Sequence, residues 1–135
     1  MMLSSVVIDT DDVAMLSNFY QNLLGWEKKV YDHGEDGLWV TLRNKKESTT
    51  RLVFQELKNY QRPVWPEEKG TQQQMMHLDF YVDNLEESVK HALDCGAVLA
   101  PHQSGDWKVL KDPSGHRFAL FQKEKGSLEK TNLIC

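Results

Sequence analysis

The order of predicted secondary structure repeats once along this 135-residue chain. A shift of 72 positions places Asp11, before the first predicted helix, on Asp83, before the second. With one residue gapped inside the helix, Gly25 falls on Gly96. Each half reads as one strand, one helix and three further strands, and neither half is large enough to close a sheet of its own. The repeat therefore predicts an α+β fold in which two tandem βαβββ modules form one curved eight-stranded sheet, with both helices on its convex side.

Local patterns support each element of this repeat. Apolar residues between Val13 and Leu24 follow the i, i+3, i+4, i+7 spacing of an amphipathic helix, and Gly25 supplies its left-handed end. The second helix opens on an Asx residue and closes at Gly96. Strands are predicted at residues 5–9, 26–31, 38–43 and 52–57 in the first half, and at 77–83, 98–102, 107–112 and 116–122 in the second.

We interpret the whole chain, residues 1–135, as a single domain. The first module covers residues 4–57 and the second covers 77–122. Residues 58–76 contain Pro, Gly and a glutamine run without a clear period, so they are predicted to form a connector. Residues 123–135 are mostly polar and are predicted to form a tail.

Composition narrows the classes of partner. The formal net charge is −4 and no stretch gathers Lys and Arg, which argues against nucleic-acid binding. No window approaches the roughly 20 apolar residues of a membrane span, and the N-terminus does not resemble a signal peptide. The two cysteines, Cys95 and Cys135, do not form a disulfide framework. We therefore expect a cytoplasmic protein with no membrane or nucleic-acid partner.

Strand alternation predicts which side chains face away from the helices. In the strand at 77–83, the apolar residues Leu78, Phe80 and Val82 form one face, so the residues between them point to the concave side. The same reasoning on the other strands gives a mixture of aromatic and polar groups, which is typical of a small-molecule pocket. The candidate ligand-binding residues are Trp39, Gln55, His77, Asp79, Tyr81, Trp107, Arg117 and Phe121.

Two alternatives remain open within this set. Trp39 and Trp107 either contact a ligand or fill the groove as core. Arg117 favours an acidic ligand and Asp79 a basic one, unless the two side chains form an ion pair with each other. Trp26 and Trp65 are expected to lie outside the concave face. The histidines expected in loops or on a helix surface, in contact with solvent, are His33, His91, His102 and His116.

Four sequence segments resemble a known superfamily. They are FYQNLLGW at the end of the first helix, HLDFYVDNLEES at the start of the second module, GA after the second helix, and DPSGHRFALF near the end. In this order, from Val6 to Gln122, they resemble the vicinal oxygen chelate superfamily, which includes glyoxalase I, bleomycin-resistance proteins and extradiol dioxygenases. Within it, the chain is most similar to small glyoxalase-like proteins.

The resemblance implies where a metal would bind in related enzymes. The corresponding positions here are Ser5, Gln55, His77 and Ala119. Only His77 is a good ligand, whereas a catalytic metal normally needs about three protein donors. We therefore expect no metal site and no cofactor. Members of the superfamily commonly pair, so a homodimer is expected.

These features favour a small-molecule binding protein of the glyoxalase and bleomycin-resistance type, without an intact metal site. The predicted ligand is an aromatic or cationic molecule between Trp39 and Trp107, because the chain is acidic and the concave face is aromatic. One alternative is a lyase, isomerase or dioxygenase acting on a small metabolite, in which His77 with Asp79 supplies metal-free acid–base chemistry; no catalytic residue is assigned. The other alternative is an interaction protein whose own side chains fill the concave face.

Overall fold

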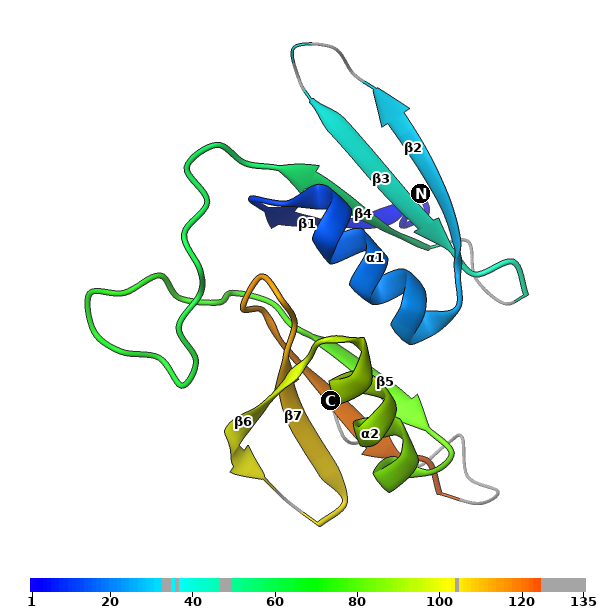
Figure 1. Ribbon diagram of the computed structural model, residues 1–135, viewed down its shortest axis with the longest axis vertical. Helices are drawn as coiled ribbons and strands as arrows, with labels where there is room; N and C mark the ends of the chain where they lie inside the picture. Colours follow the sequence, from blue (N-terminus) through cyan, green and yellow to red (C-terminus); the bar gives the residue numbers. More distant parts are fainter. Residues whose placement is uncertain (33–34, 36, 47–49, 104, 125–135) are drawn as a thin grey trace.

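The computed structural model describes residues 1–32, 35, 37–46, 50–103 and 105–124, with the side chains of Asp32 and His102 left out. Each half of the chain folds as a βαβββ module, as predicted (Figure 1). The first module contains β1 (Ser5–Thr10), α1 (Val13–Leu24), β2 (Glu27–Asp32), β3 (Leu38–Arg43) and β4 (Arg51–Glu56). The second contains β5 (Leu78–Val82), α2 (Leu85–Cys95), β6 (Val98–Gln103), β7 (Trp107–Lys111) and β8 (Arg117–Gln122).

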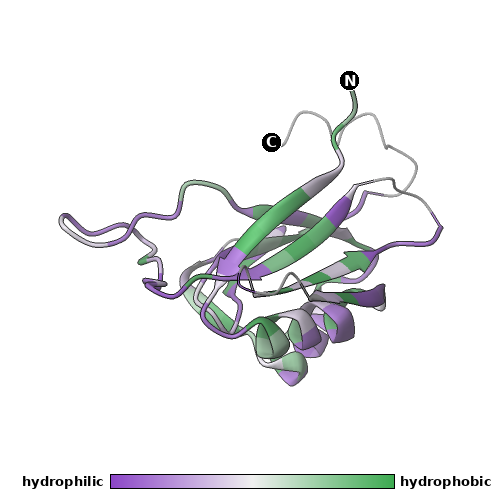
Figure 2. Cartoon of the chain, turned by 90° about the horizontal axis from the view of Figure 1, so that it is seen from above, coloured by the Kyte–Doolittle hydropathy of each residue, from purple (hydrophilic) through white to green (hydrophobic). Residues whose placement is uncertain are grey.

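The eight strands form two four-stranded sheets with the same topology. Their orders are β1-β4-β3-β2 and β5-β8-β7-β6. In each sheet the first and last strands of the module pair in parallel, and the other neighbours are antiparallel. The predicted curved surface is therefore built from two four-stranded sheets rather than from one continuous eight-stranded sheet. Both helices lie on the same side of the strands (Figure 2).

Capping side chains define where each helix begins. Asp12 Oδ1 accepts a hydrogen bond from Met15 N at 2.9 Å, and Asn84 Oδ1 accepts one from Glu87 N at 3.0 Å. Each side chain satisfies an N–H group that has no partner inside its helix. Both helices end on a left-handed glycine, as the repeat predicts. No helix in the described part of the chain is long and apolar enough to cross a membrane.

One hydrophobic core joins the two modules. The Phe19 ring of α1 lies 5.9 Å from the Phe118 ring of β8, and the Tyr20 ring stacks at 5.5 Å on Phe54 of β4. The first helix therefore packs against both sheets. The predicted strand alternation is confirmed, because alternate residues of β5 pack on this core. They are Leu78, Phe80 and Val82.

Candidate ligand-binding site

A cavity of about 530 Å³ lies where the two modules meet. It is bounded by β1, by the connector and by the first residues of β5 and β8. Most of its wall is apolar, and its polar groups come mainly from the connector and from the turn before β8. The residues that line it are Val6, Val7, Ile8, Asp9, Tyr20, Leu57, Asn59, Tyr60, Gln61, Pro63, Gln72, Gln73, Gln74, Met75, Met76, His77, Leu78, His116 and Arg117.

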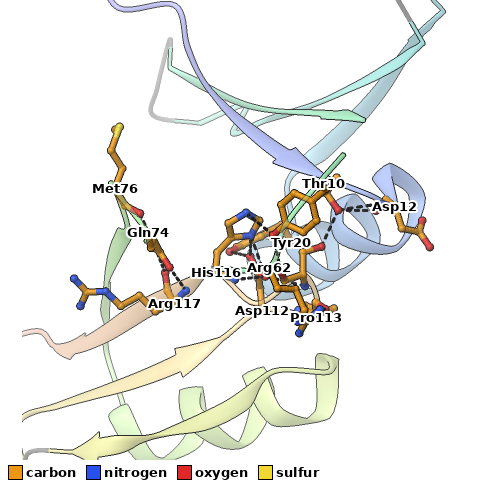
Figure 3. Close-up of polar contacts among 12 residues, drawn as sticks. Thr10, Asp12, Tyr20, Arg62, Gln74, Met76, Asp112, Pro113, His116 and Arg117 are labelled. Carbon is orange, nitrogen blue, oxygen red and sulfur yellow. Dashed lines mark hydrogen bonds and ion pairs between the residues drawn. The ribbon is translucent and has the colours of Figure 1, made fainter. Parts of the chain in front are cut away.

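A buried carboxylate lies beside this cavity. Asp112 Oδ2 accepts hydrogen bonds from the Tyr20 hydroxyl at 2.7 Å and from His116 Nδ1 at 2.9 Å (Figure 3). Its other oxygen, Oδ1, accepts from the backbone N–H groups of Ser114 and His116 at 2.9 and 3.0 Å. The carboxylate is fully buried, so these donors replace the water it has lost. Burial, with the nearby charge of Asp112, raises the pKa of Tyr20 well above its usual range.

The turn that contains Asp112 also holds the connector in place. The Tyr60 hydroxyl donates to the backbone oxygen of Ser114 at 2.6 Å and lies 3.2 Å from His116 Nε2. Arg62 Nη1 donates to the Pro113 oxygen at 2.8 Å. The Ser114 hydroxyl is 2.7 Å from that of Thr10 at the end of β1. The turn thus ties together β1, α1 and the connector.

The sequence prediction for His116 was wrong. Its side chain is only 18% exposed, because Asp112 and Tyr60 hold the two sides of its ring. The tight turn was predicted, but its contacts with distant segments carry no local sequence signal. His91 is exposed as expected, although its Nε2 lies 3.1 Å from two carbonyl oxygens at the end of α1. His33 and the side chain of His102 lie outside the described residues.

The Tyr60 contacts predict a pH-dependent stability. Burial, followed by the charge of Asp112, raises the pKa of Tyr60. Above about pH 10 the unfolded chain releases this proton while the folded chain retains it, so the stabilising effect is complete below pH 10 and is lost at higher pH. Urea unfolding between pH 9 and 11.5 should show a smaller loss of stability in Tyr60→Phe than in the wild type. If the free energy of unfolding fell with pH in Tyr60→Phe as steeply as in the wild type, this prediction would be contradicted. Tyr31→Phe on β2 is the control for removing a tyrosine hydroxyl.

The polar residues predicted on β4 and β5 form two separate pairs. Gln55 Nε2 donates to Asp9 Oδ1 at 2.7 Å, and His77 Nε2 lies 3.4 Å from Asp79 Oδ1. Among the described ion pairs, Asp79 lies beside His77, and none joins Asp79 to Arg117. The His77–Asp79 pair is about one-third exposed, so solvent screens it.

The four positions carried over from the metalloenzymes do not all converge. The backbone partner of Gln55 is Asp9, whereas Ser5 pairs with Arg51, four positions earlier along β4. At the rise of a β-strand this places Ser5 about 13 Å from Gln55 along the ladder. Among the residues that the structure describes, no three His, Cys, Asp or Glu side chains gather as a metal site would require.

The connector contributes a residue that was predicted to lie elsewhere. Trp65 packs against a small cluster on the second sheet, formed by Ala100, Val109 and Ala119, so its predicted place outside the concave face was wrong. The Arg117 guanidinium carbon lies 4.6 Å from the centre of the Trp65 ring. The connector has no period from which this return to the sheet could be predicted. Trp26 instead packs on the main core, outside the concave face as expected.

The other aromatic candidates form a row on the second sheet. Phe121 stacks with Trp107 at 6.0 Å and lies 6.3 Å from Tyr81. Trp107 and Phe121 also pack against the cluster that Trp65 covers, which supports the alternative that Trp107 is partly core. Trp39 pairs with Gln55 across β3 and β4 and is half-buried. Of the eight predicted site residues, the cavity wall contains His77 and Arg117.

Comparisons with known proteins agree with this architecture. The family model described as a glyoxalase-like domain matches residues 5–121. A glyoxalase family protein from Enterococcus faecalis is 23% identical with a TM-score of 0.66, over 89% of this chain and 96% of that chain. Glyoxalase I from Leishmania major is 20% identical with a TM-score of 0.69, over 98% of this chain and 94% of its own.

A third solved structure extends the comparison. The antibiotic-binding protein TnmS3 from Streptomyces sp. CB03234 is 16% identical with a TM-score of 0.63, over 92% of this chain and 97% of that chain. Comparison with curated proteins gives no match. The family model spans nearly all of both modules, and the three solved structures have the same fold as this chain. The chain therefore belongs to the glyoxalase-like domain family, within the vicinal oxygen chelate superfamily.

Proposed function

We propose that this protein binds a small molecule in the cavity between its two modules. The observation that carries the proposal is the cavity itself, whose volume of about 530 Å³ is in the range of small-molecule sites. Its wall combines apolar strand and connector residues with a few fixed polar groups. This combination lets apolar contact supply affinity while the polar groups orient the ligand.

The position of Trp65 supports this cavity over the predicted site between Trp39 and Trp107. Trp65 already covers part of the concave face of the second sheet, where it packs on Ala100, Val109 and Ala119. The cavity beside β1 is open instead, and Val7 in its wall is 44% exposed. The description of TnmS3 as an antibiotic-binding protein is consistent with ligand binding by this fold.

The proposal does not include a metal or a cofactor. Ser5 lies far from Gln55 along the ladder, and Gln55 is hydrogen-bonded to Asp9. The alternative of metal-free acid–base chemistry would use His77 and Asp79, which lie 3.4 Å apart. We also propose that the protein acts in the cytoplasm as a homodimer, since β2 and β6 are edge strands of their sheets and contribute no residue to the cavity wall.

A cavity-filling variant tests the proposed function. The ligand panel contains 1-naphthylacetate, 1-naphthylacetamide and 2-(1-naphthyl)ethylamine, which share an aromatic body. At 100 times its Kd, a bound ligand stabilises the fold by about 2.7 kcal/mol, which raises Tm by several degrees. We expect at least one compound to bind, and Val7→Trp to weaken its binding at least 10-fold by calorimetry, because the indole occupies the cavity.

Val30→Trp is the matched control for this variant. Val30 is an exposed residue of β2, 56% accessible, and is not part of the cavity wall. The Val30→Trp protein should bind as the wild type does. Equal binding by the Val7→Trp protein would show that the site lies elsewhere, and a panel without any binder would contradict the proposed function.

A further inference from the structure

Arg117 carries a charge that the described part of the chain leaves without an acidic partner. None of the ion pairs among the described residues includes its guanidinium. Its Nε atom is buried and has no hydrogen-bond partner. A buried donor without an acceptor destabilises a fold, more so when the group is charged. The arginine is therefore kept in an environment that lacks an anion.

The surroundings of Arg117 fix its position at the cavity wall. Its backbone N–H donates to Gln74 Oε1 at 2.7 Å, and its backbone oxygen accepts from Gln74 Nε2 at 3.0 Å. Its guanidinium lies over the Trp65 ring at 4.6 Å. Figure 3 shows the side chain extending away from the Asp112 cluster. The connector thus holds both the backbone and the charged group before any ligand binds.

The neighbouring carboxylates are already engaged by other groups. Asp112 accepts four hydrogen bonds from Tyr20, Ser114 and His116. Asp79 lies beside His77 at 3.4 Å, and Asp9 accepts from Gln55 at 2.7 Å. Arg117 is therefore a charged group of the cavity wall that forms no ion pair with any described residue.

We propose that the ligand of this cavity is an amphipathic organic acid whose carboxylate binds Arg117. This inference rests on the proposed function and specifies its ligand class. The planar guanidinium fork matches a carboxylate with two parallel hydrogen bonds. The apolar body of the acid lies against the β1 side of the cavity, which includes Val7, Ile8 and Leu57.

The net charge of the chain and the charge of Arg117 favour ligands of opposite sign. A net charge of −4 favours cationic ligands at long range. Salt screens charges over about 8 Å at physiological ionic strength, so direct contact decides the preference. Measurements at 0.15 M salt therefore report the contact with Arg117 rather than the net charge.

The same naphthyl compounds test this inference, because they differ in the charge of one group. We expect 1-naphthylacetate to bind at least 10-fold more tightly than 1-naphthylacetamide by calorimetry. Arg117→Met should remove this difference. It should weaken the binding of 1-naphthylacetate at least 10-fold, while the affinity for 1-naphthylacetamide changes less than 2-fold. Lys111→Met is the matched control, because Lys111 is the backbone neighbour of Arg117 on β7 and lies outside the cavity wall.

The outcomes separate this inference from the proposed function. The inference would be overturned if 1-naphthylacetate and 1-naphthylacetamide bound with equal affinity, or if the Arg117→Met protein still preferred 1-naphthylacetate. In either case the cavity would remain a binding site. An equal loss in Lys111→Met would show a general charge effect and would also overturn it. If no compound binds the wild type, the proposed function and this inference both fail.

Discussion

Replacing Asp112 with alanine is expected to destabilise the protein by about 3–5 kcal/mol, comparable to breaking a buried charged network. The substitution leaves the fully buried Tyr20 hydroxyl without an acceptor. It also removes the acceptor for two backbone N–H groups and for His116 Nδ1. Several buried donors lose their partner together, so the loss exceeds that of one ordinary hydrogen bond.

Urea unfolding of the Asp112→Ala and Asp106→Ala proteins measures this effect. Asp106 is an exposed aspartate in the turn before β7, so its replacement should change the free energy of unfolding by less than about 0.5 kcal/mol. Similar values for the two variants would show that the Asp112 network does not hold the modules together.

Phe118→Ala is expected to have a second large effect, of about 3–5 kcal/mol. The Phe118 side chain is fully buried. Its ring lies 5.9 Å from Phe19, 6.2 Å from Tyr20 and 6.1 Å from Phe80, so its removal leaves a cavity between α1 and β5. Because the core is shared, we also expect one unfolding transition rather than two.

Circular dichroism and tryptophan fluorescence during denaturation test this prediction together. The two signals should follow the same transition in the wild type and in Phe118→Ala. Phe121→Ala is the control, since Phe121 is a half-buried residue of the same strand in the smaller cluster. A Phe118→Ala protein as stable as Phe121→Ala, or one with separated transitions, would contradict the shared core.

Local sequence signals predicted most of the fold. Asp12 and Gly25 mark the two ends of α1 through contacts within a few residues, so their roles are visible in the sequence. Strand alternation likewise placed Leu78 and Phe80 toward the helices. Both signals depend on geometry that repeats over short stretches of chain.

The site was less predictable because it depends on distant contacts. Asp9, rather than Ser5, lies opposite Gln55, since the register of two parallel strands is set by packing after a long crossover. The connector brings Tyr60 to the turn before β8 and Trp65 to the second sheet. Such contacts join segments about 50 residues apart and leave no periodic pattern in either segment.

The most direct measurement of the central claim is a map of backbone amide shifts during titration with 1-naphthylacetate. Ligand in the cavity between the modules should shift the amide signals of Val6–Asp9 and of residues 75–78, on the two sides of that cavity. Signals from β2 and β6, at the outer edges of the two sheets, should remain unchanged. Shifts confined to those outer strands, or to the residues around Trp39 and Trp107, would contradict ligand binding between the modules.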